Sequence, residues 1–309
     1  MEKNNKIYTN TIFVTLAALI CTALWGSATP FIKIGYKLML PHGGVPSTIL
    51  FAGIRFMLAG IITVLIYSIA RKKFLYPKKE NIKKVAVVSC FQTVIQYIFF
   101  YVGLSITSGV KGTVASGSNA FFALLIASLI FKQEKLTFKK VFACVIGFAG
   151  VILINLNGLG FKYDMELLGF FLVILSAISY AISSVLIKSY SKVEDPVVIS
   201  GYQFAAGGLF MIIVGLAFGG RVTVASSQAW GVLIYLAFLS AIAYALWGVL
   251  LKYNPVSKVT IFSFMIPVFG VLLSMLMLGE TNSVPVINLV ITLVLICTGI
   301  VMLNYKKEK

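Results

Sequence analysis

The sequence predicts an all-α integral membrane protein whose ten transmembrane helices form two inverted five-helix repeats. Three observations lead to this fold class. Hydrophobic residues make up 60% of the chain and charged residues only 11%, with a mean hydropathy of +1.00, which excludes a soluble globular protein. The apolar residues gather in ten long runs. The second half of the chain also repeats the pattern of the first half.

Each run is long enough to cross a bilayer, which takes about 20 residues of apolar helix. The run 112–131, for example, has no charge and stops at Lys132, whereas the run 38–70 is interrupted only by Arg55. The start of the eighth run, Val222–Gln228, is expected to be a loop. In chain order the ten runs are 7–32, 38–70, 85–110, 112–131, 141–161, 167–187, 196–220, 222–251, 259–279 and 281–305.

The basic residues predict that both termini lie in the cytoplasm. With the N-terminus inside, 20 Lys and Arg residues fall in cytoplasmic segments and five fall on the opposite side. Short loops that carry an excess of Lys and Arg stay in the cytoplasm during insertion. The same rule explains the net charge of +17 without a nucleic-acid partner. We therefore expect a multi-pass protein of the plasma membrane.

The two repeats are expected to span residues 1–158 and 159–309. The aligned positions are Trp25 with Tyr180, Arg55-Phe56 with Gln203-Phe204, Ala59-Gly60 with Gly207-Gly208, Thr93 with Ser240, Tyr97 with Tyr244, Phe100 with Trp247, and Gly150 with Gly299. Because each repeat has an odd number of spans, the second must be inverted in the membrane. Inverted repeats are typical of alternating-access transporters, which bind substrate near the midplane where the repeats meet.

Several short motifs give the chain a family resemblance. They are Trp25-Gly26-Ser27-Ala28-Thr29-Pro30 in the first span, Arg55-Phe56 in the second, Gly279-Glu280 closing the ninth and Gly299 in the tenth. In this order they resemble the drug/metabolite transporter superfamily, in its ten-helix EamA-like branch. The resemblance implies a secondary carrier of small metabolites, such as amino acids or amines, with a cavity between the repeats. It also implies that the fifth and tenth helices are peripheral.

Aromatic and hydroxyl side chains are the candidates for substrate binding. Thr93, Tyr97 and Phe100 share one helical face, and the second repeat has the same pattern. A binding site lined by such aromatic and hydroxyl side chains can hold an aromatic ring or an organic cation. The alternative is that these aromatic residues face lipid or the membrane interface. The full predicted set is Trp25, Thr93, Tyr97, Phe100, Asn119, Tyr180, Ser240, Tyr244 and Trp247.

Four further polar residues are predicted to be structural or to contact an anionic group of the ligand. Arg55 lies inside a span with no carboxylate in any span to neutralise it. Arg55 has two possible roles: it forms a fixed hydrogen bond between helices, or it binds a carboxylate of the ligand. Gln203 is its counterpart in the second repeat. Glu134 and Glu280 stand at span ends, where capping or pairing with Lys explains them better than a proton relay.

The sequence indicates a transporter and not an enzyme. No cluster of His, Cys and Asp has the spacing of a metal site, and no Ser or Cys has a histidine base, so we expect no cofactor. The main hypothesis is a monomeric secondary transporter of a small metabolite, with the lipid bilayer as its surroundings. A flippase component for a lipid-linked head group is the alternative, and ten spans in one chain argue against it. A third hypothesis is a membrane scaffold or sensor that transports nothing. The lack of a soluble domain or long loop in the sequence argues against it.

Overall fold

The computed structural model describes residues 7–40, 43–107, 112, 115–154, 164–278 and 286–304, and within these ranges the chain forms helices and no strands. In chain order the elements are α2 (Thr11–Met39), α3 (Val45–Ala70), η1 (Lys79–Asn81), α4 (Ile82–Ser89), η2 (Cys90–Ile95), α5 (Gln96–Ile106), α7 (Asn119–Leu125), η3 (Ile126–Ile130), α8 (Phe138–Ile154), α9 (Asp164–Tyr190), α10 (Pro196–Ala217), α11 (Ser227–Tyr253), α12 (Val256–Thr260), η5 (Ile261–Phe264), α13 (Met265–Leu278) and α14 (Val286–Asn304).

The long helices α2, α10 and α11 begin at residues whose side chains cap them. The side chain of Asn10 accepts hydrogen bonds from the backbone amides of Ile12 and Phe13 at the start of α2. Asp195 caps α10, whose first residue is proline, and Ser226 caps α11. These side chains satisfy amide groups that have no partner within the helix. The local sequence therefore fixes where the long apolar segments start.

In the described part of the chain, six helices are long and apolar enough to cross a membrane, namely Thr11–Met39, Val45–Ala70, Lys79–Leu104, Leu167–Tyr190, Pro196–Ala217 and Ser227–Tyr253. Three shorter apolar helices are Ala115–Ile130, Val256–Gly270 and Ile287–Leu303. The third predicted span starts earlier than expected, at Lys79 instead of 85, because lysines at a helix end can extend their charge to water. The all-helical character of the prediction is confirmed, and these nine apolar helices fit a membrane protein, whereas the count of ten spans in inverted repeats stays a prediction.

The outward faces of these helices suit a lipid environment. On α2, Ile12, Leu16 and Ile20 lie one turn apart and are each more than half exposed. Similar exposed residues follow α10, including Leu209 and Ile213. Soluble monomers rarely expose continuous apolar stripes of this kind. These stripes therefore suit contact with the hydrocarbon core of a bilayer.

Helices α3 and α10 pack along each other through glycines. A Cβ atom at Gly60 would lie 2.4 Å from the backbone nitrogen of Ala205 and 2.5 Å from the carbonyl oxygen of Gly201. A Cβ atom at Gly208 would lie 2.3 Å from the nitrogen of Met57. Small residues allow two helix backbones to approach this closely in lipid. Only glycine fits at these positions.

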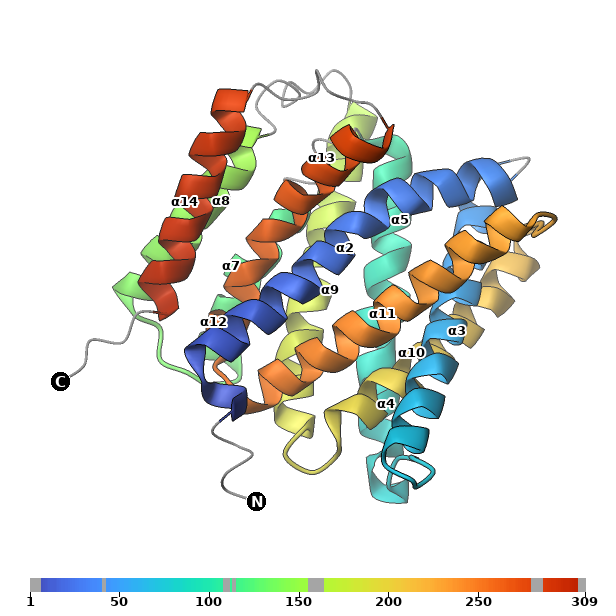
Figure 1. The fold of residues 1–309 in the computed structure, drawn as a ribbon, viewed down its shortest axis with the longest axis horizontal. Coiled ribbons are helices and arrows are strands. Elements are labelled where there is room, and N and C mark those ends of the chain that lie inside the picture. Colours follow the sequence, from blue (N-terminus) through green and yellow to red (C-terminus); the bar gives the residue numbers. More distant parts are fainter. Residues whose placement is uncertain are drawn as a thin grey trace.

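Helices α8 and α14 lie side by side at one edge of the bundle, and α3 and α10 lie at the other edge (Figure 1). Gly150 of α8 faces Thr292, whose hydroxyl donates to the Gly150 carbonyl at 3.2 Å. Gly299 of α14 faces Ala143 in turn. Between these two pairs, α2 contacts α11 and α13, and α5 contacts α9. The central helices α2, α5, α9 and α11 therefore surround the middle of the molecule.

Polar side chains connect the helices at one end of the bundle, which we call the basic end. The ring of Tyr8 stacks on that of Tyr253 at 5.0 Å, so the start of α2 meets the end of α11. Arg71 after α3 forms an ion pair with Asp195 before α10. The amide of Asn81 donates to Glu194 at 3.1 Å. These contacts join both halves of the chain at this end.

Candidate functional site

The middle of the bundle holds a set of aromatic and polar side chains that we call the central cluster. Its members come from α2, α3, α5, α9, α10 and α11, and are Trp25, Arg55, Phe56, Tyr97, Tyr180, Gln203, Phe204, Tyr244 and Trp247. Most are closed off from the surface: the exposed fraction is 1% for Trp247, 2% for Arg55, 4% for Tyr244 and 6% for Tyr180. The sequence predicted seven of these nine positions.

Trp25 is the aromatic centre of this cluster. Its ring meets Tyr244 and Trp247 of α11, each with ring centroids 4.9 Å apart, and Tyr180 of α9 at 6.3 Å. All three contacts are edge-to-face, the arrangement that the quadrupoles of aromatic rings favour. The predicted aromatic residues Trp25, Tyr180, Tyr244 and Trp247 therefore lie together inside the protein and not on its lipid face.

Two hydrogen bonds link the predicted polar residues in pairs. The Arg55 guanidinium donates from Nη2 to the Ser240 hydroxyl at 3.0 Å. The Thr93 hydroxyl donates to the Gln203 side-chain oxygen at 2.5 Å. All four side chains are at most 2% exposed. Each bond joins the second helix of one predicted repeat to the third helix of the other.

The hydroxyls of Tyr97 and Tyr244 form a third polar link, with 2.7 Å between their oxygens. We expect that Tyr97→Phe and Tyr244→Phe each destabilise the protein and that the double variant is no worse than either single one. The expected coupling energy is about 0.6 kcal/mol, up to about 1.7 kcal/mol, as for hydrogen bonds between membrane helices. Unfolding of all four proteins in detergent measures this double-mutant cycle. Strictly additive effects would contradict the link.

Sequence reasoning missed three aromatic residues of this region. Phe56 stacks on Phe204 at 5.1 Å, and these rings contact Tyr97 at 4.3 Å and Tyr244 at 4.7 Å. Tyr101 is 4% exposed, and its ring centroid lies 5.9 Å from that of Tyr97. Phe56 and Phe204 already stood at aligned positions, and Tyr101 follows Tyr97 by one helical turn. Those two signals could have identified all three.

The predicted residues Phe100 and Asn119 are not members of the central cluster, although Phe100 packs against it. Phe100 is partly buried, and its ring contacts are with Tyr97 and Tyr101 of its own helix. The π-helix Cys90–Ile95 precedes it and alters the helical register on which the shared face of Thr93, Tyr97 and Phe100 was predicted. Asn119 of α7 accepts a hydrogen bond from the Ser263 hydroxyl of η5 at 2.7 Å.

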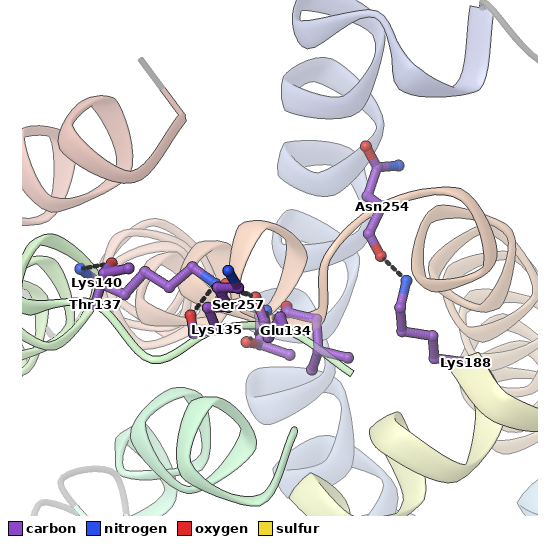
Figure 2. Close-up of polar contacts among 9 residues, drawn as sticks. Glu134, Lys135, Thr137, Lys140, Lys188, Asn254 and Ser257 are labelled. Carbon is purple, nitrogen blue, oxygen red and sulfur yellow. Dashed lines mark hydrogen bonds and ion pairs between the residues drawn. The ribbon is translucent and has the colours of Figure 1, made fainter. Parts of the chain in front are cut away.

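Glu134 connects the loop after η3 to the start of α12 at the basic end (Figure 2). Its carboxylate accepts hydrogen bonds from the backbone amide of Ser257 at 2.9 Å and from the Ser257 hydroxyl at 2.5 Å. Lys140 pairs with the same carboxylate at 2.6 Å. Nearby, the ammonium group of Lys188 donates to the carbonyl oxygen of Asn254. Glu280 lies outside the described residues.

The side chains of the central cluster offer groups for non-covalent contacts. Among the described residues, no group of three His, Cys, Asp or Glu side chains could hold a metal ion. The central cluster offers rings, hydroxyls, amides and one guanidinium. These groups can surround a small organic molecule, contact its rings and hydrogen-bond its polar groups.

Comparison with known families identifies the type of protein. The model of the EamA-like transporter family matches residues 12–156 and again residues 167–305. The chain belongs to the EamA-like transporter family. The resemblance inferred from the Trp25 and Arg55 motifs is therefore confirmed, and the protein is a membrane transporter of the drug/metabolite type. None of the family or relative names points to catalysis.

Similar proteins match most of the length of this EamA-like chain. An uncharacterized transporter of Archaeoglobus fulgidus is 25% identical over 267 residues, covering 84% of this chain and 88% of its own. The transporter YvbV of Bacillus subtilis is 24% identical over 300 residues, covering 92% and 89%. A solved crystal structure superposes with a TM-score of 0.77 at 18% identity, covering 94% of this chain and 96% of the other. The last likeness supports the fold alone.

Proposed function

We propose that this protein is a secondary transporter that moves a small metabolite across the plasma membrane by alternating access. Its ten helices form two inverted five-helix repeats, residues 1–158 and 159–309, and the substrate binds in the central cluster between them. Both termini are cytoplasmic. The protein works as a monomer in the bilayer and needs no cofactor.

The observation that carries this proposal is that residues at aligned positions of the two repeats make equivalent contacts in the central cluster. Arg55 aligns with Gln203, and Ser240 aligns with Thr93. The Arg55–Ser240 hydrogen bond is therefore equivalent to the Gln203–Thr93 hydrogen bond. In the same way, the ring contact of Phe56 with Tyr97 is equivalent to that of Phe204 with Tyr244. Tyr97 and Tyr244 align with each other, so their hydrogen bond joins equivalent positions of the two repeats. This is the pattern expected where a pseudo-two-fold axis passes through a substrate site.

The packing of the outer helices supports the same repeat. A Cβ atom at Gly60 would meet Gly201, and one at Gly208 would meet Gly53. These two contacts are equivalent, because they join aligned positions of the two repeats. The contacts of Gly150 with Thr292 and of Gly299 with Ala143 are related in the same way. The family model also matches twice, once in each half. Two similar halves can rock against each other around a fixed site.

The basic end supports the proposed orientation and suggests a closed cytoplasmic side. Lys140, Lys188 and Arg71 all lie at this end, where an excess of positive charge marks the cytoplasm. The contacts of Glu134 with Ser257 and of Tyr8 with Tyr253 hold helices of the two halves together there. In the alternating-access cycle these contacts have to break when the site opens to the cytoplasm.

Flux into liposomes tests the proposal. The full-length protein is reconstituted in vesicles, and labelled organic acids, amines, amino acids and neutral metabolites are offered one at a time. We expect saturable, protein-dependent flux of one class down its concentration gradient, without ATP or an imposed pH gradient, because no described carboxylate contacts the central cluster to carry a proton. Protein-free vesicles are the control. Absence of flux for every class would contradict the proposal.

A further inference from the structure

Arg55 is a buried cation without a countercharge among the described residues. It is 2% exposed, its guanidinium lies 4.8 Å from the Phe56 ring centroid, and the Ser240 hydroxyl accepts a hydrogen bond from it. A positive charge within a membrane protein is costly unless a partner or water compensates it. A neutral hydroxyl and an aromatic ring compensate it only in part. The site therefore lacks one negative charge.

The carboxylates of the described residues are engaged elsewhere or stand at helix ends. Glu134 pairs with Lys140, and Asp195 pairs with Arg71. Glu194 accepts from the backbone amide of Lys78 and from Asn81. The other described acidic residues are Glu80, Asp164 and Glu166, at the starts of η1 and α9. Among the acidic residues whose side chains the structure describes, which are Glu80, Glu134, Glu194 and Asp195, none forms an ion pair with Arg55.

Within the central cluster, the buried polar atoms that have no partner are mostly hydrogen-bond donors. Within the described residues, no partner is bound by Nε of Arg55, Nε1 of Trp25, Nε1 of Trp247, Nε2 of Gln203 or the hydroxyl of Tyr180. An indole nitrogen can only donate. Gln92 and Gln96 add unpartnered amide oxygens, which can accept from a hydroxyl or amino group. A ligand rich in acceptors satisfies the larger part of this set.

We infer that Arg55 binds the carboxylate of the substrate, so that the transported molecules are organic acids with an aromatic or other apolar body. This inference rests on the proposed transport function, because the ligand is the transported substrate. Arg55 supplies the charge and a planar fork of donors that suits a carboxylate. Trp25, Tyr180 and Trp247 supply the apolar wall against which a ring packs. The charge lies in one repeat only, because Gln203 occupies the equivalent position.

Intrinsic fluorescence provides the binding assay, since two of the three tryptophans, Trp25 and Trp247, belong to the central cluster. The purified full chain is titrated with 3-phenylpropionate, 3-phenylpropanol and 3-phenylpropylamine, which share one carbon skeleton and differ in charge. We expect saturable binding of the acid, binding of the alcohol weaker by about tenfold or more, and no binding of the amine. Equal or tighter binding of the amine, or no binding of any of the three, would overturn the inference.

Arg55→Gln places the residue of the second repeat in the first and removes the charge. We expect this variant to lose the preference for the acid over the alcohol, while Arg55→Lys, which keeps the charge without the fork, retains part of it. Unchanged binding of the acid by Arg55→Gln would show that Arg55 has only a structural role. If Arg55→Gln does not fold, the ligand series on the unaltered protein still decides between acid and amine. Flux of amines or neutral metabolites in the liposome assay, without acid binding, would reject this inference and leave the transport function intact.

Discussion

Trp247→Ala is expected to destabilise the protein by about 3–5 kcal/mol and to abolish transport, whereas Trp230→Ala leaves both unchanged. Both tryptophans belong to α11, so the two variants make the same chemical change on one helix. Trp247 is 1% exposed and packs against Trp25 at 4.9 Å, whereas Trp230 is 51% exposed. Removing the inner ring leaves a cavity in the central cluster, and removing the outer ring alters only the surface.

Thermal unfolding in detergent and flux into liposomes measure the two effects separately. Trp247→Phe keeps a ring in the cluster and is expected to fold well with reduced flux, which separates loss of function from loss of stability. If Trp247→Ala folds and transports normally, the central cluster is not the substrate site. If Trp230→Ala is as damaging as Trp247→Ala, burial is not the reason for the effect.

The sequence identified the central residues because the chain contains the pattern twice. A single helix with Thr93 and Tyr97 does not reveal which face is buried. Ser240 and Tyr244 repeat the pattern in the other half, and the structure joins the two copies through the Tyr97–Tyr244 hydrogen bond. Duplication therefore supplied long-range information that spacing along one helix cannot provide.

Other features depend on contacts that no local pattern encodes. Glu134 was expected at a span end, but its contact with Ser257 joins residues 123 positions apart in the chain. The π-helix at Cys90–Ile95 changes the direction of every following side chain, and no glycine or proline in that segment signals it. Asn119 was predicted to bind substrate, but the partner that the structure shows for it is Ser263. Residue type predicted the chemistry of these positions better than it predicted their partners.

The glycine contact between α3 and α10 leads to the second large effect. Gly60→Ala is expected to destabilise the protein by about 1–3 kcal/mol or more, because the added methyl group overlaps backbone atoms of the neighbouring helix. The overlapping atoms are the nitrogen of Ala205 at 2.4 Å and the carbonyl oxygen of Gly201 at 2.5 Å. A side chain could rotate away, but a helix backbone cannot, so the two helices must separate along their length.

Gly231→Ala is the matched control, since Gly231 also lies within a helix and a Cβ atom there meets nothing within 4 Å. Alanine favours the helix over glycine, so this variant is expected to be neutral or stabilised by up to about 1 kcal/mol. Gly208→Ala tests the same contact from the other helix, because its Cβ would lie 2.3 Å from the nitrogen of Met57. Unfolding in detergent, followed by size-exclusion chromatography, compares the three variants. Equal stability of Gly60→Ala and Gly231→Ala would mean that close packing of α3 on α10 does not hold the two halves of the transporter together.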